Sequence, residues 1–342
     1  MTPLGSRPAA LPRRRHARVV GAAASLLLLA LLLAPAVGST SLDLTRVWAD
    51  PWSWNTNPDA AVFFVARLPR VLLAALVGAI LAQAGAVFQS LLRNPLATPY
   101  TIGVSAGATL GAFVGMRLAP PGLGGELLVP ASALAGAFVT TLAVFGLAVR
   151  GGRVPTTVLL LAGVTLNYTF GAVIMLMQYF ADHTETARMV RWMMGDLEGG
   201  TYRLLALVLA GAAPALWALS RRGLVFNLLS LGEEEAEIHG VDSRRAILGS
   251  LLAAAWITGL AVSVAGPVGF VGIIVPHALR LLGGADYRIL LPAAVLGGAG
   301  FMILCDTLSR TLLAPLELPV GVLTASLGGP FFLYLLLARR AR

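Results

Sequence analysis

The chain has 342 residues, 57% of them hydrophobic and only 12% charged, with a mean hydropathy of +0.82, so it lacks the polar covering that a soluble core of this size needs. The net charge of +9 comes from arginines scattered between apolar runs, a placement that disfavours nucleic-acid binding and favours a role in membrane topology. All 25 basic residues are arginine, which excludes the lysine-containing phosphate-binding loop of NTPases and Schiff-base catalysis through lysine.

The apolar runs predict an all-α, polytopic membrane protein with about ten transmembrane helices. In chain order we expect spans at 19–38, 68–92, 101–118, 128–149, 156–180, 202–219, 246–265, 268–282, 289–312 and 320–338. With the amino end inside, 17 of the 25 arginines fall in cytoplasmic segments, which satisfies the positive-inside rule. An even number of spans then places both termini in the cytoplasm. We treat 1–342 as a single transmembrane domain whose residues 1–18 form a cytoplasmic basic tail.

The first apolar run has two interpretations. Its basic start at 13–15 and the small residues at 34–36 resemble a signal peptide with a cleavage site. The run from Val19 to Val37 is nevertheless longer than the apolar part of a usual signal peptide, about 7–15 residues, and its removal would leave the termini on opposite sides. We therefore predict a retained helix. The tryptophans of the outer loop that follows indicate an interfacial aromatic belt: Trp48, Trp52 and Trp54.

Two apolar runs are interrupted by prolines and glycines where a membrane helix would continue, namely RNPLATPYTIGVSAGA at 93–108 and GPVGFVGIIVPH at 266–277. Non-helical backbone at membrane depth is tolerated only where protein or a water-filled cavity satisfies its N–H and C=O groups, and broken helices recur at the central site of transporters. We therefore predict a transport path along the residues that interrupt the helices. These are Pro95, Pro99, Gly266, Pro267, Gly269 and Pro276.

Glycines also mark a helix contact between the two breaks. Gly103, Gly107, Gly111 and Gly115 recur every fourth residue, which predicts one helix face that a neighbouring backbone can approach closely.

The single cysteine, Cys305, lies in an apolar run, so no intrachain disulfide can form. The four histidines are far apart in sequence, and no metal site is predicted.

One substantial polar insertion, 223–245, is placed in the cytoplasm by the topology. Its acids, Glu233–Glu235 and Glu237, follow Gly232 and suit the positive end of a short helix, while five aliphatic residues between Leu224 and Leu231 give it an apolar side. The insertion is either a solvated connector with an acidic cap or a docking element for a cytoplasmic partner. Its apolar side, flanked by acids and without a membrane to enter, favours docking.

Several motifs together resemble the permease subunits of binding-protein-dependent ABC importers for iron chelates and cobalamin. The likeness extends from about residue 60 to 340 and rests on RLPR (67–70), the 93–108 break, LLLAGV (159–164), the 232–240 loop, AGPVGFVGIIVPHALRLL (265–282), ADYRILLP (285–292) and ELPVGVLTASLGGPFFLYLL (317–336). The resemblance implies the type II importer permease fold in the inner membrane. It also implies a dimer of permease subunits, here expected to be a homodimer, two cytoplasmic ATPase subunits and an extracytoplasmic substrate-binding protein. The chain would then be no enzyme and carry no cofactor, because ATP is hydrolysed on the separate subunits.

The resemblance also implies roles for particular residues. It places Arg67, Arg70 and Arg310 at the outer mouth, where they would meet acidic groups of the binding protein; alternatively they snorkel to the interface, and Arg310 pairs with Asp306 one helical turn earlier. Four residues resemble cytoplasmic gate positions, with helix capping and turn chemistry as the alternative: Asn94, Leu96, Thr156 and Thr157. The expected ATPase-coupling residues are Leu231, Gly232, Glu233, Glu234, Glu235, Ala236, His239 and Gly240.

The expected function is uptake of an iron(III) chelate, a siderophore complex or haem, by alternating access driven by ATP hydrolysis on the partner. A cobalamin importer permease of the same family is the alternative. A proton- or sodium-coupled secondary transporter is more remote, because Asp306 is the only acid expected inside a span and an arginine lies one turn away. A membrane-embedded enzyme is disfavoured because no catalytic cluster of His, Asp and Glu appears in the spans.

Overall fold

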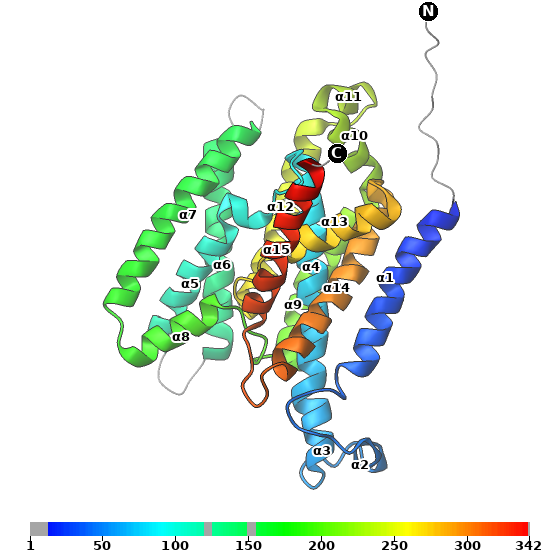
Figure 1. Cartoon of the computed structure of the whole chain (residues 1–342). Coiled ribbons are helices and arrows are strands. Elements are labelled where there is room, and N and C mark those ends of the chain that lie inside the picture. The colour runs from blue at the N-terminus through cyan, green and yellow to red at the C-terminus, as the bar shows by residue number, and fades with distance from the viewer. Residues whose placement is uncertain (1–12, 120–124, 149–154, 341–342) are drawn as a thin grey trace, which may run out of the picture.

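The computed structural model describes residues 13–119, 125–148 and 155–340, which fold into helices joined by short loops (Figure 1). The α-helices are α1 (Arg13–Leu33), α2 (Leu44–Ala49), α3 (Pro58–Ala61), α4 (Leu68–Leu91), α5 (Val104–Leu118), α6 (Gly125–Ala148), α7 (Thr156–Tyr179), α8 (His183–Met193), α9 (Tyr202–Arg221), α10 (Gly223–Leu231), α11 (Glu233–Ile238), α12 (Ser243–Ala265), α13 (Val271–Gly283), α14 (Tyr287–Thr311) and α15 (Val320–Arg340). A π-helical turn, η1 (Val62–Arg67), joins α3 to α4, and a 3-10 turn, η2 (Pro99–Ile102), precedes α5. The predicted all-α fold is confirmed.

The predicted spans coincide with helices. Six helices in the described ranges are long and apolar enough to cross a bilayer by length and composition: the continuous stretch Pro58–Leu91, then α6, α7, α9, α12 and α14. Four shorter apolar helices lie in α1, α5, α13 and α15. These six and four correspond one for one to the ten expected spans, which supports the count of about ten.

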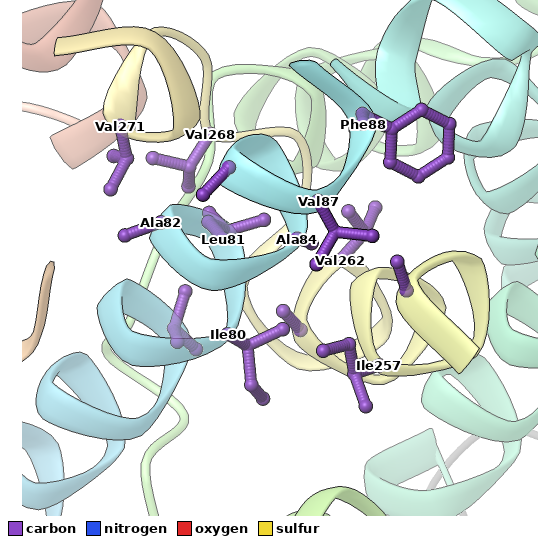
Figure 2. Packing of buried hydrophobic residues seen from close by; sticks show 14 of the residues in the cluster. Ile80, Leu81, Ala82, Ala84, Val87, Phe88, Ile257, Val262, Val268 and Val271 are labelled. Atoms are coloured by element: carbon purple, nitrogen blue, oxygen red, sulfur yellow. The ribbon is translucent and has the colours of Figure 1, made fainter. Parts of the chain in front are cut away.

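Helix α4 is the centre of the bundle, and nearly all its residues from Pro69 to Leu91 are buried. Figure 2 shows its apolar side chains, among them Ile80 and Val87, packed beside Ile257 and Val262 of α12. The helix is apolar on all sides because other helices surround it, principally α12, α13 and α14.

Glycines set the closest helix crossings. A Cβ added at Gly78 of α4 would collide with the carbonyl oxygen of Gly298 on α14. On α5, the predicted glycine face is confirmed, since a side chain at Gly107 would meet Thr140 of α6 and one at Gly111 would meet the backbone of α6. Because glycine has no side chain, the backbones of these helices approach each other closely. In a lipid bilayer, where the hydrophobic effect does not drive helices together, such close packing contributes to helix association.

Helix α1 is part of this bundle and packs along α14. Val19, Ala23 and Ala30 are buried, and Gly300 of α14 lies against the backbone of α1. This packing is what the prediction of a retained helix requires.

The bundle has two distinct ends in Figure 1. One end carries α10 and α11 together with the described beginning of α1 and end of α15, and we call it the α10–α11 end. The opposite end carries α2, α3 and α8, and we call it the α2–α8 end. Of the segments predicted to be cytoplasmic, the parts around the start of α1, the α10–α11 pair and the end of α15 thus lie at the α10–α11 end. Of the predicted basic tail, residues 1–12 lie outside the described residues.

Candidate functional site

The first predicted break separates α4 from α5. Helix α4 ends at Leu91, and the segment 92–103 contains a turn at Arg93, whose φ is +48°, and the single turn η2. It closes at Gly103, whose φ of +87° lies in the left-handed region that glycine adopts without steric cost.

The second predicted break, 266–270, separates α12 from α13. Gly266 and Phe270 both have positive φ, +64° and +66°, and for Phe270 this is an uncommon backbone conformation. Gly272, just beyond the break, packs against Leu81 and Gly85 near the middle of α4. The break therefore lies at about half the depth of the bundle, and Figure 2 shows Val268 and Val271 on the side of α4 that carries Leu81 and Ala82.

The two breaks touch each other through one side chain. The Tyr100 hydroxyl donates a hydrogen bond to the carbonyl oxygen of Val268 (2.7 Å) and accepts one from the Val268 N–H (3.1 Å). The Asn167 amide on α7 donates to the Tyr100 carbonyl oxygen (3.2 Å), and the Asp196 N–H donates to the carbonyl oxygen of Ala265 at the end of α12 (2.9 Å). Protein groups thus satisfy the irregular backbone, as its depth requires.

The expectation that Pro276 belongs to the second break is wrong. Pro276 lies inside α13, which continues to Gly283. Proline has no N–H to bond the carbonyl oxygen four residues earlier, that of Gly272. The Gln89 side-chain amide of α4 donates to that oxygen instead (2.8 Å). The helix tolerates the proline because a neighbouring helix supplies the missing donor.

The predicted docking arginines lie at the α2–α8 end, but they are buried rather than displayed. Arg67 is 6% exposed and its guanidinium donates to the carbonyl oxygens of Pro35, Ala36 and Thr40. It thereby ties the end of η1 to the connection that follows α1. The role of the three docking arginines in binding a partner protein remains a prediction.

Arg70 and Arg310 form a buried charge cluster with Asp306 and Glu317. Asp306 is fully buried and accepts from Arg70 Nε at 2.9 Å through Oδ1, while its Oδ2 lies 3.1 Å from Arg310 Nε. The predicted pairing of Arg310 with Asp306 is confirmed. A second ion pair joins Arg70 to Glu317 at 2.7 Å, so the cluster connects α4, α14 and the loop before α15.

A cavity of about 650 Å3 opens beside this charge cluster, and Arg67, Arg70, Arg310, Glu198 and Glu317 contribute to its lining. The negative charge of neighbouring Asp196 raises the pKa of the Glu198 carboxyl, and burial and the charge of Glu317 act in the same direction. The α2–α8 end is therefore hollowed, and charges of both signs face the hollow.

The four predicted gate residues lie at the surface of the single chain. The Asn94 side chain accepts from the Leu96 N–H (3.0 Å), which is the turn chemistry named as the alternative. Leu96 is 41% exposed, Thr156 begins α7, and Thr157 next to it is exposed. Their role as a gate remains a prediction.

The predicted coupling insertion forms two short helices, α10 and α11, and its last three residues begin α12. Leu231 and Ile238 are 72% and 78% exposed, whereas Ala236 is buried. Gly232 has a φ of +147°, and the turn it makes lets α11 start with three glutamates at its positive end. His239 and Gly240, which end this element, are exposed.

Polar contacts attach this element to the bundle. The Asn227 side chain of α10 donates to Asp286 (2.8 Å) and accepts from the Tyr287 N–H (2.9 Å) at the beginning of α14. The Ser90 hydroxyl of α4 donates to the Phe226 carbonyl oxygen (3.1 Å). Arg93 at the start of the first break lies 3.5 Å from Glu233 of α11. Movement of α10 and α11 is therefore connected to α4, to α14 and to the first break.

Sequence reasoning missed the partners of Arg70, the role of Gln89 and the contact of Tyr100 with Val268. A polar side chain inside an apolar run is itself a signal, because such a group must find a partner in the bundle. Gln83 and Gln89 both carry that signal in α4.

In the described part of the chain, a bundle of about ten apolar helices with a helix break at mid-depth and a short helix pair at one end has the architecture of a membrane transport subunit. The model of the FecCD transport family matches residues 26–338, and the chain belongs to this family. It is a permease subunit of an ABC importer, a class in which a separate subunit hydrolyses ATP and a binding protein is a further partner.

Similar proteins cover nearly the whole chain. The hemin transport system permease protein HmuU of Yersinia pestis is 42% identical over 322 residues, 92% of this chain and 95% of that protein. The cobalamin import system permease protein BtuC of Halobacterium salinarum is 41% identical over 304 residues, 87% of this chain and 80% of that protein. A solved structure described as an inward-facing metal-chelate type ABC transporter matches with a TM-score of 0.81 at 30% identity, covering 94% of this chain and 99% of that one.

Proposed function

We propose that this permease subunit takes up an iron(III) chelate, either a siderophore complex or haem, across the inner membrane, with cobalamin as the alternative cargo. Two copies of the chain would form the path, with both termini and the α10–α11 end in the cytoplasm. Two ATPase subunits would bind at the α10–α11 end, and a substrate-binding protein would bind at the α2–α8 end.

The apposed breaks at mid-depth are the observation that carries this proposal. Irregular backbone held by Tyr100 and Val268 can rearrange at less cost than an unbroken helix, because fewer helical hydrogen bonds must be lost. Alternating access needs such a rearrangement in response to the ATPase. The contacts of Arg93 and Asn227 offer the mechanical connection from α10 and α11.

The choice of cargo rests on similarity. A relative named for hemin is 42% identical, and the solved neighbour is described as a metal-chelate type transporter. Relatives named for cobalamin or vitamin B12 are 38% to 42% identical, so cobalamin remains the alternative cargo.

Reconstitution tests the proposal. The permease, its ATPase subunit and its binding protein are placed in proteoliposomes with ATP on the side of α10 and α11, and movement of haem, a ferric siderophore and cobalamin is measured in parallel. We expect ATP-dependent movement of an iron chelate. Selective movement of cobalamin would identify cobalamin as the cargo in place of an iron chelate. Movement without ATP, or no movement of any of the three compounds, would contradict the proposed function.

A further inference from the structure

Tyr100 occupies a junction of three elements. It belongs to η2 in the first break, its hydroxyl bonds both backbone groups of Val268 in the second break, and its carbonyl oxygen accepts from Asn167 of α7. Val268 is 1% exposed, so its N–H and C=O depend on protein partners rather than water. One hydroxyl therefore holds the midpoint of the 266–270 segment.

The bonding groups matter more than the shape of the side chain. A phenylalanine ring would fill nearly the same volume, but it could neither donate to nor accept from Val268. Removing the hydroxyl would leave two buried backbone groups without these partners, a loss that costs more than the average worth of a hydrogen bond. Substitution of Tyr100 by phenylalanine therefore removes the hydrogen bonds to Val268 while nearly preserving the packing of the ring.

Both attached segments continue into parts that the transport cycle would move. On one side, segment 92–103 begins at Arg93, which lies 3.5 Å from Glu233 of α11. On the other side, segment 266–270 ends at Phe270, whose side chain lies against Gly328 of α15, and leads directly into α13. Tyr100 is the bonded contact between these two sides.

We propose that Tyr100 is a positioning residue whose hydroxyl fastens the first break to the second, so that displacement of segment 92–103 by α11 also displaces segment 266–270. The inference rests on the proposed ATP-driven transport. In this proposal the hydroxyl affects the amount of cargo moved per ATP hydrolysed, and not the rate of hydrolysis itself.

The test uses Tyr100→Phe, with Tyr179→Phe as the matched control because Tyr179 is 81% exposed at the end of α7. Amide hydrogen exchange in lipid nanodiscs is measured over 266–270. We expect exchange there to be about tenfold faster or more in Tyr100→Phe, because local opening no longer breaks two hydrogen bonds. Exchange in α5 and α6 should match the wild type, and the control should match it throughout.

The second measurement is cargo moved per ATP hydrolysed by the reconstituted complex. We expect this ratio to fall several-fold in Tyr100→Phe while hydrolysis continues. Unchanged exchange over 266–270 would show that the hydroxyl does not hold the segment. Faster exchange with an unchanged ratio would show a structural role only, and either result overturns the proposal.

A milder variant keeps the test decisive if Tyr100→Phe does not assemble. Asn167→Ala removes only the amide that holds the Tyr100 backbone. It should shift both measurements in the same direction by a smaller factor, and wild-type values for both would overturn the proposal. If the wild type moves none of the cargos, the proposed function fails, whereas the exchange comparison still decides whether the hydroxyl holds segment 266–270.

Discussion

Asp306 determines the charge balance inside the α2–α8 end. Its two carboxylate oxygens each face an arginine, and all three side chains are almost completely buried. Removing one member of a buried ion pair leaves an uncompensated charge, which costs about 3–5 kcal/mol. We expect Asp306→Asn to lower the free energy of unfolding by about that amount, measured by denaturant titration in detergent.

Glu317→Gln is the comparison for that variant. Its side chain is 28% exposed, so solvent compensates part of the loss of the Arg70 pair, and we expect a cost of roughly 1 kcal/mol or less. Equal stability of Asp306→Asn and the wild type would show that the buried cluster contributes nothing to the fold.

Asp286 makes the attachment of α10 sensitive to acid. Hydrogen bonds from the Arg288 side chain, with the Asn227 amide and the Arg288 N–H, lower the pKa of Asp286 from 3.8 to about 2. A lowered folded-state pKa means that the stabilisation is complete above pH 3.8 and is lost as the pH falls toward 2. The protection of α10 amides, measured as the ratio of the intrinsic to the observed exchange rate at each pH, should therefore fall over this pH range. Asp286→Asn should flatten the profile, and an identical profile in the variant would contradict this assignment.

Among individual contacts, sequence spacing predicts those that are local. Arg310 and Asp306 are one helical turn apart, and their pairing follows from that spacing. Arg70 meets Asp306 and Glu317 across 236 and 247 residues of chain, and no spacing rule specifies such pairs. The same reason explains why the buried state of the predicted docking arginines could not be foreseen.

At the scale of elements, the crossing of α5 and α6 depends on missing side chains. A Cβ at Gly111 would overlap the carbonyl oxygen of Ser132, a backbone atom that cannot move aside without displacing α6. Gly146 of α6 is the matched control, because nothing lies within 4 Å of a Cβ built there. We expect Gly111→Ala to lower the thermal midpoint clearly in detergent, whereas Gly146→Ala leaves it equal or higher. Equal midpoints for the two variants would refute the close crossing.

The exposed acids of α11 should mediate attachment of the ATPase. Glu233 is already engaged with Arg93, so reversal of Glu234 and Glu235 to Arg tests docking without breaking that contact. We expect the amount of ATPase co-purified from detergent to fall several-fold and uptake to stop. Charge reversal would remove the electrostatic complementarity between α11 and the ATPase, on which association depends. Glu185→Arg on α8, at the opposite end of the bundle, should leave the amount of co-purified ATPase unchanged. Undiminished recovery with normal uptake would exclude the docking role.

Glycine and proline predict some helix breaks correctly and others incorrectly. Glycine and proline at 266–269 predicted the second break because their conformational limits act locally. Pro276 misled by the same rule, since the donor that keeps it inside α13 comes from Gln89 of another helix. Local signals are therefore reliable for backbone geometry and unreliable where a neighbour compensates for it.

For the whole molecule, the buried pairing of Asp306 bears on the energy source. A proton carrier must gain and lose its proton during transport, but the Asp306 carboxylate is held between two arginines. We expect uptake in vesicles to require ATP on the side of α10 and α11 and to survive a protonophore at constant ATP. Loss of uptake after addition of the protonophore would instead favour a secondary transporter.

The number and order of spans could be predicted from the sequence, because each apolar run must cross the same thickness of hydrocarbon. The central position of α4 was harder to foresee, although its run is apolar on every side. The orientation of α8, which follows α7 at the α2–α8 end, was missed because its eleven residues are amphipathic and too short to span. Which helices are neighbours depends on packing among all of them, and single runs do not contain that information.

The pairing of Gln89 with the carbonyl oxygen of Gly272 has a thermodynamic consequence. Because Pro276 supplies no donor, α13 lacks the hydrogen bond from residue 276 to residue 272, and one amide on α4 contributes to the resistance to bending at this point. The curvature of α13 and the position of α4 are therefore linked variables. Any ligand, partner or substitution that shifts α4 must change the bending equilibrium of α13 by the same free energy with which bending of α13 acts back on α4.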